Sequence, residues 1–313
     1  MGFRTLYMGT AEIACAPLKA LNLLPEYEIV GVLTQPDRPR GRSMKVLSSP
    51  VKQCAKELGL LVLQPQTLCN DDVLEQILSL RADLIVVSAF GQILPKSVLD
   101  LPRHGAVNIH ASILPRHRGA APIQRAILEG DNETGVTLMK MDEGLDTGDI
   151  IAVSRTPIQA TDNSQILHDR LAELGATLIV RTLPDYIAGK ITPNPQNNNL
   201  ATYAKKITKD DGRIDWSLPA VEIHRRIRAF TPWPGAFTFL PVEKKRLLKV
   251  CEAGISESEG SAGEILSVIG NNLLVACGQK SLTLTELQRE GSRRMNVDNF
   301  MNGCSLEPGM MLG

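Results

Sequence analysis

The sequence predicts an α/β fold, in which a doubly wound, Rossmann-like N-terminal domain with a mostly parallel sheet precedes a small, OB-like C-terminal β-barrel. Continuous apolar segments alternate with amphipathic ones through the first half of the chain. This alternation is typical of a parallel sheet that helices cover on both faces. Beyond residue 245, short apolar segments are separated by Gly and Asn turns. That spacing is typical of a small barrel.

Apolar runs predict the strands of the first domain, and apolar residues three or four positions apart predict its helices. The predicted strands are 3–8, 28–34, 60–63, 82–88, 105–110, 134–140 and 149–154, and the predicted helices are 11–24, 51–58, 71–80 and 164–187. The turn at 9–12, Gly-Thr-Ala-Glu, lacks the glycine spacing of dinucleotide-binding proteins, so we predict no dinucleotide.

A chain of 313 residues is long for one domain. The polar stretch 192–199, rich in Pro and Asn, predicts a linker. We therefore expect a catalytic domain at 1–190, a linker at 191–208 and a C-terminal domain at 209–313. Within the C-terminal domain, the pattern predicts a helix at 220–230 and strands at 246–250, 263–268, 272–277 and 281–287.

The composition argues against several classes of protein. No apolar run approaches the roughly 18 residues of a membrane span, so we expect no membrane partner. The six cysteines form no C-x-x-C pair, which is typical of free thiols in a reducing compartment. We expect a monomeric, cytoplasmic protein.

The stretch with the densest chemistry runs from Asn108 to Asp149. Side chains alternate between the faces of a strand, so Asn108 and His110 share one face of the predicted strand 105–110. Taken alone, such a pair is ordinary at a sheet edge. The segment 141–149, Met-Asp-Glu-Gly-Leu-Asp-Thr-Gly-Asp, changes this interpretation, because a surface turn does not need so many carboxylates and glycines.

These motifs resemble the folate-dependent formyltransferases along nearly the whole chain. The resemblance is carried by Asn108-x-His110, Ser112-x-Leu114-Pro115, Arg118-Gly119-Ala120-Ala121-Pro122 and Asp142-x-Gly144-x-Asp146-Thr147-Gly148. It implies a co-substrate, 10-formyltetrahydrofolate, and a catalytic set of Asn108, His110 and Asp146. It also implies a folate pocket formed by Phe90, Gly91, Ser112, Ile113, Leu114, Pro115 and Asp142.

Formyl transfer to an amine is acyl transfer, in which the carbonyl oxygen gains negative charge and two nitrogens exchange a proton. Asn108 and His110 can donate to that oxygen, and Asp146 can pair with His110 or relay the amine proton. Which group is the acid and which the base stays open. A metal is the competing interpretation of His110, His117, Asp142 and Asp146, but no H-x-x-x-H spacing is present, and we predict no metal.

Basic residues concentrate in two places, although the formal net charge is zero. Residues 34–52 carry five Lys or Arg against one acid, and residues 205–249 carry eleven against five. Any basic surface loop can be a solvated face. Resemblance to the branch of the family that formylates methionyl initiator tRNA implies tRNA contacts instead, with Arg42 at the position that discriminates the initiator. The implied contact residues are Arg38, Arg40, Arg42, Lys45 and Lys206.

The alternatives are a related formyltransferase acting on a small amine, such as an amino-sugar nucleotide or glycinamide ribonucleotide, and a nucleic-acid-binding module with an inactive α/β domain. The first needs no basic loop, and the second needs no intact Asn-His-Asp set.

Overall fold

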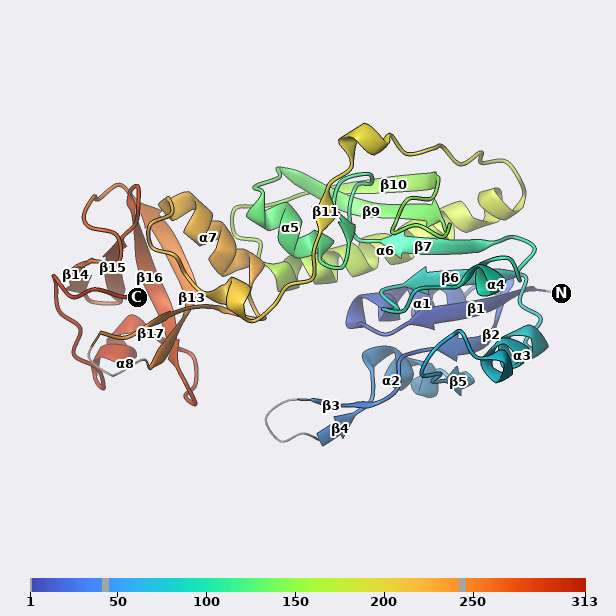
Figure 1. The fold of residues 1–313 in the computed structure, drawn as a ribbon, viewed down its shortest axis with the longest axis horizontal. Coiled ribbons are helices and arrows are strands. Elements are labelled where there is room, and N and C mark those ends of the chain that lie inside the picture. The colour runs from blue at the N-terminus through green and yellow to red at the C-terminus, as the bar shows by residue number, and fades with distance from the viewer. Residues whose placement is uncertain (1, 41–44, 242–245) are drawn as a thin grey trace. The chain divides into compact units, whose positions relative to one another are not determined.

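The computed structural model describes residues 2–40, 45–241 and 246–313 (Figure 1). They form two compact units. Unit 1 comprises Met1–Pro122, Glu133–Pro157 and His168–Ala204, and unit 2 comprises Ile123–Asn132, Ile158–Leu167 and Lys205–Gly313. In the described part of the chain, no helix is long and apolar enough to cross a membrane.

The centre of unit 1 is a seven-stranded sheet with the order β10-β9-β7-β6-β1-β2-β5. Its strands are β1 (Phe3–Gly9), β2 (Tyr27–Leu33), β5 (Val62–Leu63), β6 (Leu84–Ser88), β7 (Ala106–His110), β9 (Glu133–Lys140) and β10 (Ile150–Pro157). The adjacent strands β5, β2, β1, β6 and β7 pair in parallel, and β9 is antiparallel to both of its neighbours, β7 and β10. The short loop between β9 and β10 permits only an antiparallel pair, because a parallel pair needs a long crossover. The predicted, mostly parallel sheet is confirmed.

Helices cover both faces of this sheet (Figure 1). On one face, residues of α1 (Cys15–Asn22) and α6 (Ser164–Ile187) surround a small apolar cavity together with residues of β6, β7 and β9. On the other face, α3 (Asp71–Ser79) and α4 (Lys96–Leu99) contribute to a core with strand residues such as Leu6, Ile85 and Val87. The predicted helix 11–24 is shorter in the structure, because a 3-10 turn, η1 (Glu12–Ala14), precedes α1.

Two small ribbons in unit 1 were not predicted as strands. In the basic segment, β3 (Arg38–Arg40) pairs with β4 (Lys45–Leu47), and α2 (Pro50–Glu57) follows. The carboxylate of Asp37 accepts hydrogen bonds from Lys52 Nζ at 2.5 Å and from Gln64 Nε2 at 2.9 Å, which fixes the base of this hairpin. The second ribbon pairs β8 (Arg118–Gly119) with β11 (Tyr203–Ala204) in parallel. A short 3-10 turn, η2 (Asn198–Leu200), precedes β11.

Unit 2 contains a six-stranded antiparallel sheet with the order β12-β13-β16-β15-β14, with β17 paired to β16. Its strands are β12 (Ala236–Phe239), β13 (Leu247–Ser256), β14 (Ile265–Ile269), β15 (Asn272–Ala276), β16 (Ser281–Arg289) and β17 (Met295–Asn296). The segment 310–313 connects the sheet's two edges: Leu312 N donates to Gly263 O next to β14, and Gly313 N donates to Phe239 O of β12. The predicted small barrel is thereby confirmed.

Helices and an apolar core complete unit 2. The helices α7 (Ala220–Ala229) and α8 (Val297–Met301) each contribute buried residues to a core that includes Ile223, Leu248 and Phe300. Trp216 is buried in the same core, and its indole N–H donates to Thr238 Oγ1 at 3.1 Å. Within the chain, η3 (Asp210–Gly212) precedes α7, and α5 (Pro122–Leu128) begins at the last residue of unit 1's first segment.

Candidate active site

Strand β7 positions Asn108 and His110. All five residues of the strand are buried, and it lies between β6 and β9 in the middle of the sheet. The two polar side chains therefore have to find partners inside the protein, since a buried polar group without a hydrogen bond is costly. Asn108 and His110 have these partners on two loops, the loop 141–149 and the loop that follows β7.

The first partner is the loop 141–149, which joins β9 to β10 and carries Asp146. Asp146 Oδ2 accepts a hydrogen bond from Gly119 N at 2.7 Å, and its Oδ1 accepts one from Asn108 Nδ2 at 3.3 Å. His110 Nδ1 lies 3.6 Å from Asp146 Oδ2. The structure thus brings together Asn108, His110 and Asp146, three residues predicted to be catalytic.

The second partner is the backbone of the loop that follows β7. His110 Nε2 lies 3.0 Å from the carbonyl oxygen of His117. Both ring nitrogens therefore face acceptors, one a carbonyl and the other the Asp146 carboxylate.

The loop 141–149 has a fixed internal structure. The carboxylate of Asp142 accepts hydrogen bonds from Thr147 Oγ1, at 2.7 and 2.9 Å, and from Gly144 N at 3.0 Å. A Cβ at Gly148 would overlap the backbone carbonyl of Lys140, so only glycine fits there. The glycines and carboxylates that distinguish this segment in the sequence therefore shape the loop as well as supply Asp146.

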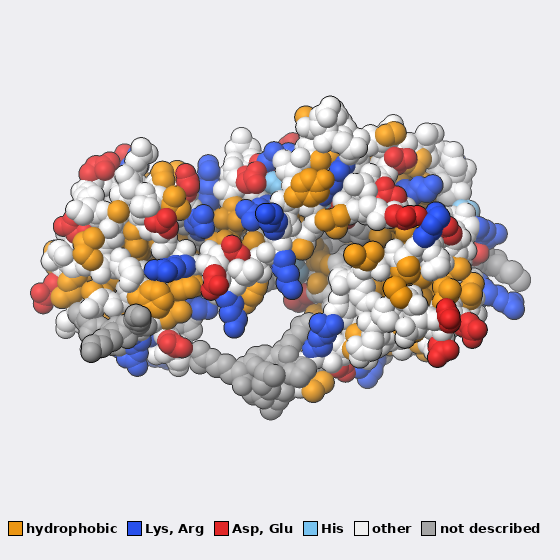
Figure 2. All heavy atoms as spheres, in the orientation of Figure 1, with side chains coloured by type: hydrophobic (Ala, Val, Ile, Leu, Met, Phe, Trp, Pro, Cys, Tyr) orange, Lys and Arg blue, Asp and Glu red, His pale blue; other side chains and the backbone are white. Residues whose placement is uncertain are grey.

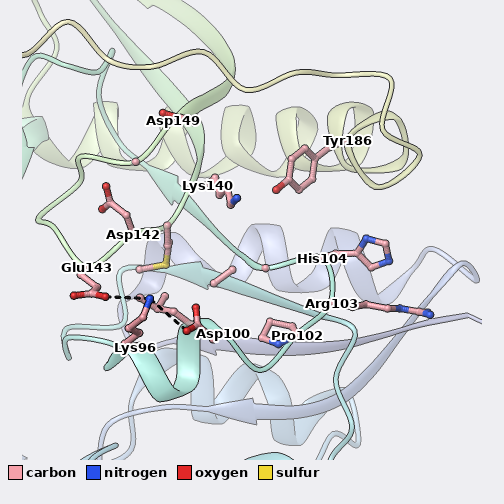
Figure 3. Close-up of a pocket in the computed structure, with 15 residues that line it drawn as sticks. Lys96, Asp100, Pro102, Arg103, His104, Lys140, Asp142, Glu143, Asp149 and Tyr186 are labelled. Atoms are coloured by element: carbon pink, nitrogen blue, oxygen red, sulfur yellow. Dashed lines mark ion pairs between the residues drawn. The ribbon is translucent and has the colours of Figure 1, made fainter.

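A cavity of about 860 Å³ lies next to this loop (Figure 3). It is lined by Lys96, Leu99, Asp100, Pro102, Arg103, His104, Gly105, Ala106, Lys140, Met141, Asp142, Glu143, Gly148, Asp149 and Tyr186. Lys96 bridges Glu143 and Asp100 at 3.3 and 3.4 Å, and hydrogen bonds to these carboxylates raise the pKa of Lys96. Asn108, His110 and Asp146 do not line the cavity, but the loop that carries Asp146 borders it.

Comparison with known proteins decides the family. The family model described as Formyl transferase matches residues 5–183, and the model described as Formyl transferase, C-terminal domain matches residues 206–305. The methionyl-tRNA formyltransferase of Citrifermentans bemidjiense is 47% identical over 312 residues, which are 100% of this chain and 97% of that protein. That of Pseudomonas fluorescens strain Pf0-1 is 50% identical over 299 residues, 96% of this chain and 92% of that protein. The chain belongs to the methionyl-tRNA formyltransferase family.

Solved structures share the fold of this methionyl-tRNA formyltransferase family member at low sequence identity. An N-formyltransferase from Helicobacter canadensis, in complex with folinic acid and dTDP-3-aminofucose, has a TM-score of 0.65 and 20% identity, over 90% of this chain and 99% of that one. HypX from Aquifex aeolicus, in complex with tetrahydrofolic acid, has a TM-score of 0.63 and 16% identity, over 96% of this chain and 47% of that one.

Among the residues predicted to bind folate, only Asp142 lines the cavity. Phe90 is buried in the apolar core, and its carbonyl accepts hydrogen bonds from Thr10 Oγ1 at 2.7 Å and Gln35 Nε2 at 3.1 Å. Its neighbour Gly91 has a φ of +79°, and Gln35 Nε2 also donates to its carbonyl, at 2.8 Å. In this formyltransferase family member, the side chains of Thr10 and Gln35 therefore hold the turn that contains Phe90 and Gly91.

The loop after β7 carries Ser112, Ile113, Leu114 and Pro115, and Thr137 of β9 holds it. Thr137 Oγ1 donates to Ser112 O at 2.7 Å and accepts a bond from Leu114 N at 3.1 Å. Ser112 Oγ donates to Arg116 O at 2.6 Å, and the side chain of Leu114 is buried.

The residues predicted to bind tRNA lie in different places. Arg38 is exposed on β3, and the backbones of Arg40 and Lys45 pair across the hairpin. Lys206 is exposed in unit 2. Arg42 lies outside the described residues.

Two groups that hold Asp146 were not predicted. The N–H of Gly119 donates to its carboxylate, and the amide of Gln196 donates to its backbone carbonyl at 2.9 Å. Gly119 has a φ of +113°, and a Cβ there would lie 2.9 Å from Ala204 O, so this position requires glycine. The Arg-Gly-Ala-Ala-Pro motif that contains Gly119 could have identified it from the sequence. Gln196 lies in a polar stretch with no signal of its own. Over the residues that the structure describes, no group of three or more His, Cys, Asp or Glu side chains is arranged to hold a metal ion.

Proposed function

We propose that this protein transfers the formyl group of 10-formyltetrahydrofolate to the α-amino group of methionyl initiator tRNA. The observation that carries the proposal is the contact among Asn108, His110 and Asp146, in a chain about half identical to methionyl-tRNA formyltransferases. The reaction needs hydrogen-bond donors for an oxygen that gains charge and a carboxylate for a proton, and these three residues supply both.

The bound folate supplies the formyl group, whose carbon forms a bond to the methionyl nitrogen as its bond to the N10 nitrogen breaks. Asn108 Nδ2 and His110 Nδ1 donate to the oxygen that gains negative charge, since Nδ1 lies 3.6 Å from Asp146 Oδ2, too far for a hydrogen bond to that carboxylate. Removal of one such donor typically costs about two to three orders of magnitude in rate. Asp146 pairs with His110 and receives the proton that the amine loses, directly or through one water molecule, and the leaving N10 nitrogen takes up one proton in exchange. The amine itself attacks, so no Ser or Cys nucleophile is required.

The cavity of about 860 Å³ is the proposed site of the folate's ring system. Its size is within the range of small-molecule sites. A pterin ring carries amino and N–H donors, and the carboxylates of Asp142 and Asp149 in the lining are suitable acceptors (Figure 3). We propose that Gly91, Ser112, Ile113, Leu114 and Pro115, which follow the carboxyl ends of β6 and β7, contact the folate on the other side of His110, and that Phe90 shapes the core beside them.

The tRNA is the proposed partner of the basic hairpin and of Lys206. Arg38 and Lys206 are exposed, and exposed Lys and Arg side chains appear on both units in Figure 2. Exposed cations suit phosphate contacts, which position a nucleic acid. We also propose that the protein acts in the cytoplasm as a monomer and without a metal.

The experiment that tests this function is formyl transfer from 10-formyltetrahydrofolate to a panel of amines. The panel contains methionyl initiator tRNA, methionyl elongator tRNA, an amino-sugar nucleotide and glycinamide ribonucleotide. We expect the highest kcat/KM with methionyl initiator tRNA. A higher kcat/KM with either small amine would refute the proposal, as would transfer that does not distinguish the two tRNAs.

A further inference from the structure

We propose that Gln196 is a positioning residue for the formyl transfer: its side-chain amide holds the backbone of the loop 141–149 so that the Asp146 carboxylate faces Asn108 and His110. The inference rests on the proposed function. Gln196 lies 50 residues from Asp146 in the sequence, in a segment whose composition predicts only a linker.

The amide of Gln196 donates twice to this loop. Its Nε2 lies 2.9 Å from the carbonyl oxygen of Asp146 and 2.7 Å from that of Gly148. Both acceptors are backbone groups, so the two bonds fix the path of the chain on either side of Thr147.

Asp146 needs such support because of its backbone conformation. Its φ is +54°, in the left-handed region that residues other than glycine seldom adopt. Residues in such conformations persist where the surroundings hold them, and they cluster at functional sites. The backbone conformation sets the direction of the Cα–Cβ bond, so a hydrogen bond to the Asp146 carbonyl also helps to place the carboxylate.

Arg118 sets the orientation of the Gln196 amide. Its Nε and Nη2 donate to Gln196 Oε1 at 3.1 and 2.8 Å, and Nη2 also donates to Asn198 Oδ1 at 2.8 Å. Arg118 is 2% exposed, and a guanidinium can only donate. The amide oxygen must therefore face Arg118, and the NH₂ group must face the two loop carbonyls. The bond from a cation to the amide oxygen also strengthens the amide as a donor.

The segment 194–204, which contains Gln196, also holds the residue whose carbonyl faces His110. His117 also has a left-handed backbone, with a φ of +59°, and its N–H donates to Thr202 Oγ1 at 2.9 Å. The carbonyl of His117 is the acceptor that faces His110 Nε2. Farther up the segment, Asn194 and Ile150 exchange two backbone hydrogen bonds of 2.8 Å at the far end of the loop. Residues 194–204 therefore hold both flanks of the catalytic set, and Gln196 makes the contact nearest to Asp146.

The test replaces Gln196 with Glu. Glutamate keeps the side chain's length and an oxygen for Arg118, but its second oxygen faces the carbonyls of Asp146 and Gly148 and repels them. We expect kcat for methionyl initiator tRNA to fall at least about tenfold, because small displacements of a catalytic group cost this much. The KM for the tRNA should stay within about twofold, since a positioning residue acts after the tRNA binds.

Hydrogen exchange of the substrate-free protein gives a second measurement that does not depend on activity. We expect faster exchange in the peptides that cover 117–121 and 141–149, because the Gly119 N–H loses its carboxylate acceptor when Asp146 moves. Gln76→Glu, the same change at an exposed position of α3, is the control and should match the wild type in both measurements. Gln196→Met removes the amide without adding charge and replaces Gln196→Glu if that variant does not fold.

A kcat within about twofold of the wild type, with unchanged exchange at 141–149, would overturn the inference. So would a loss of kcat accompanied by faster exchange across the whole of unit 1, because that result describes general destabilisation. If the wild-type protein does not formylate methionyl initiator tRNA, the proposed function fails, and the exchange comparison alone then decides the role of Gln196.

Discussion

Replacing Asp146 with Asn changes one atom of the proposed catalytic set and leaves its volume almost the same. The carboxylate accepts hydrogen bonds from two donors, Gly119 N at 2.7 Å and Asn108 Nδ2 at 3.3 Å, through different oxygens. An amide has only one oxygen, so its NH₂ group must face one of these donors. The substitution also removes the negative charge beside His110.

The geometry gives the size of the effect. At the 3.6 Å between His110 Nδ1 and Asp146 Oδ2, a unit charge pair at an effective dielectric constant of about 20 is worth about 4.6 kcal/mol. If the transition state carries such a pair and loses it, the rate falls by about three orders of magnitude or slightly more. The free energy of unfolding should fall by only about 1–3 kcal/mol, the usual cost of an unsatisfied buried donor.

The measurement is single-turnover formylation of methionyl initiator tRNA at saturating folate, with a thermal unfolding curve for each variant. Asp142→Asn is the matched comparison, because it makes the same change in the same loop. The Asp142 carboxylate contacts Thr147 and Gly144 and borders the cavity, so we expect mainly a higher KM for the folate. An Asp146→Asn rate within about tenfold of the wild type, in a folded protein, would refute the role assigned to this carboxylate.

Three further predictions follow from other parts of the chain. Arg42→Leu should raise the KM for methionyl initiator tRNA by a factor that corresponds to about 1–3 kcal/mol of binding free energy, and it should leave the KM for the folate unchanged. If Arg42→Leu and the wild type have equal kinetics at two salt concentrations, Arg42 does not take part in tRNA recognition. Burial and the neighbouring Arg228 lower the pKa of His224 below 6.5, so its contribution to stability is complete above that pH and declines as the pH falls through the lower, folded-state pKa. His224→Gln should therefore reduce the drop in thermal midpoint between about pH 7.5 and about pH 5, and an unchanged drop would contradict the assignment. Gly148→Ala should lower kcat at least about tenfold, whereas Gly254→Ala, where a Cβ meets no atom within 4 Å, should not.

The long elements could be predicted because their periodicity is strong. The helix 164–187 has the predicted bounds, and each predicted strand of the first sheet overlaps an observed one. The contact of Asn108 and His110 with Asp146 was also accessible, because strand geometry and a resemblance in two motifs point to the same residues. In a long, regular segment, many apolar residues fit the same period, and the helix or strand can therefore be predicted from the sequence.

Short-range patterns could not reveal the ribbons or Gln196. Two-residue strands such as β8 and β11 have no period, and Pro39 and Gly41 make the basic segment look like a loop. The left-handed φ of Asp146 and the buried Arg118 depend on partners that are 27 to 80 residues away in the chain. A polar stretch rich in Pro and Asn has the same composition whether it is free or hydrogen-bonded.

The side chain and carbonyl of Asp146 are held from three directions by residues 27, 38 and 50 positions away in the chain. Contacts of such separation form slowly, because the entropy of closing each loop must be overcome before the contact stabilises anything. During refolding, the helices, whose contacts are local, should therefore appear before the catalytic geometry does. The return of formylation, measured after dilution from denaturant, would then lag behind the far-ultraviolet circular dichroism signal, and activity would report the completion of folding in unit 1.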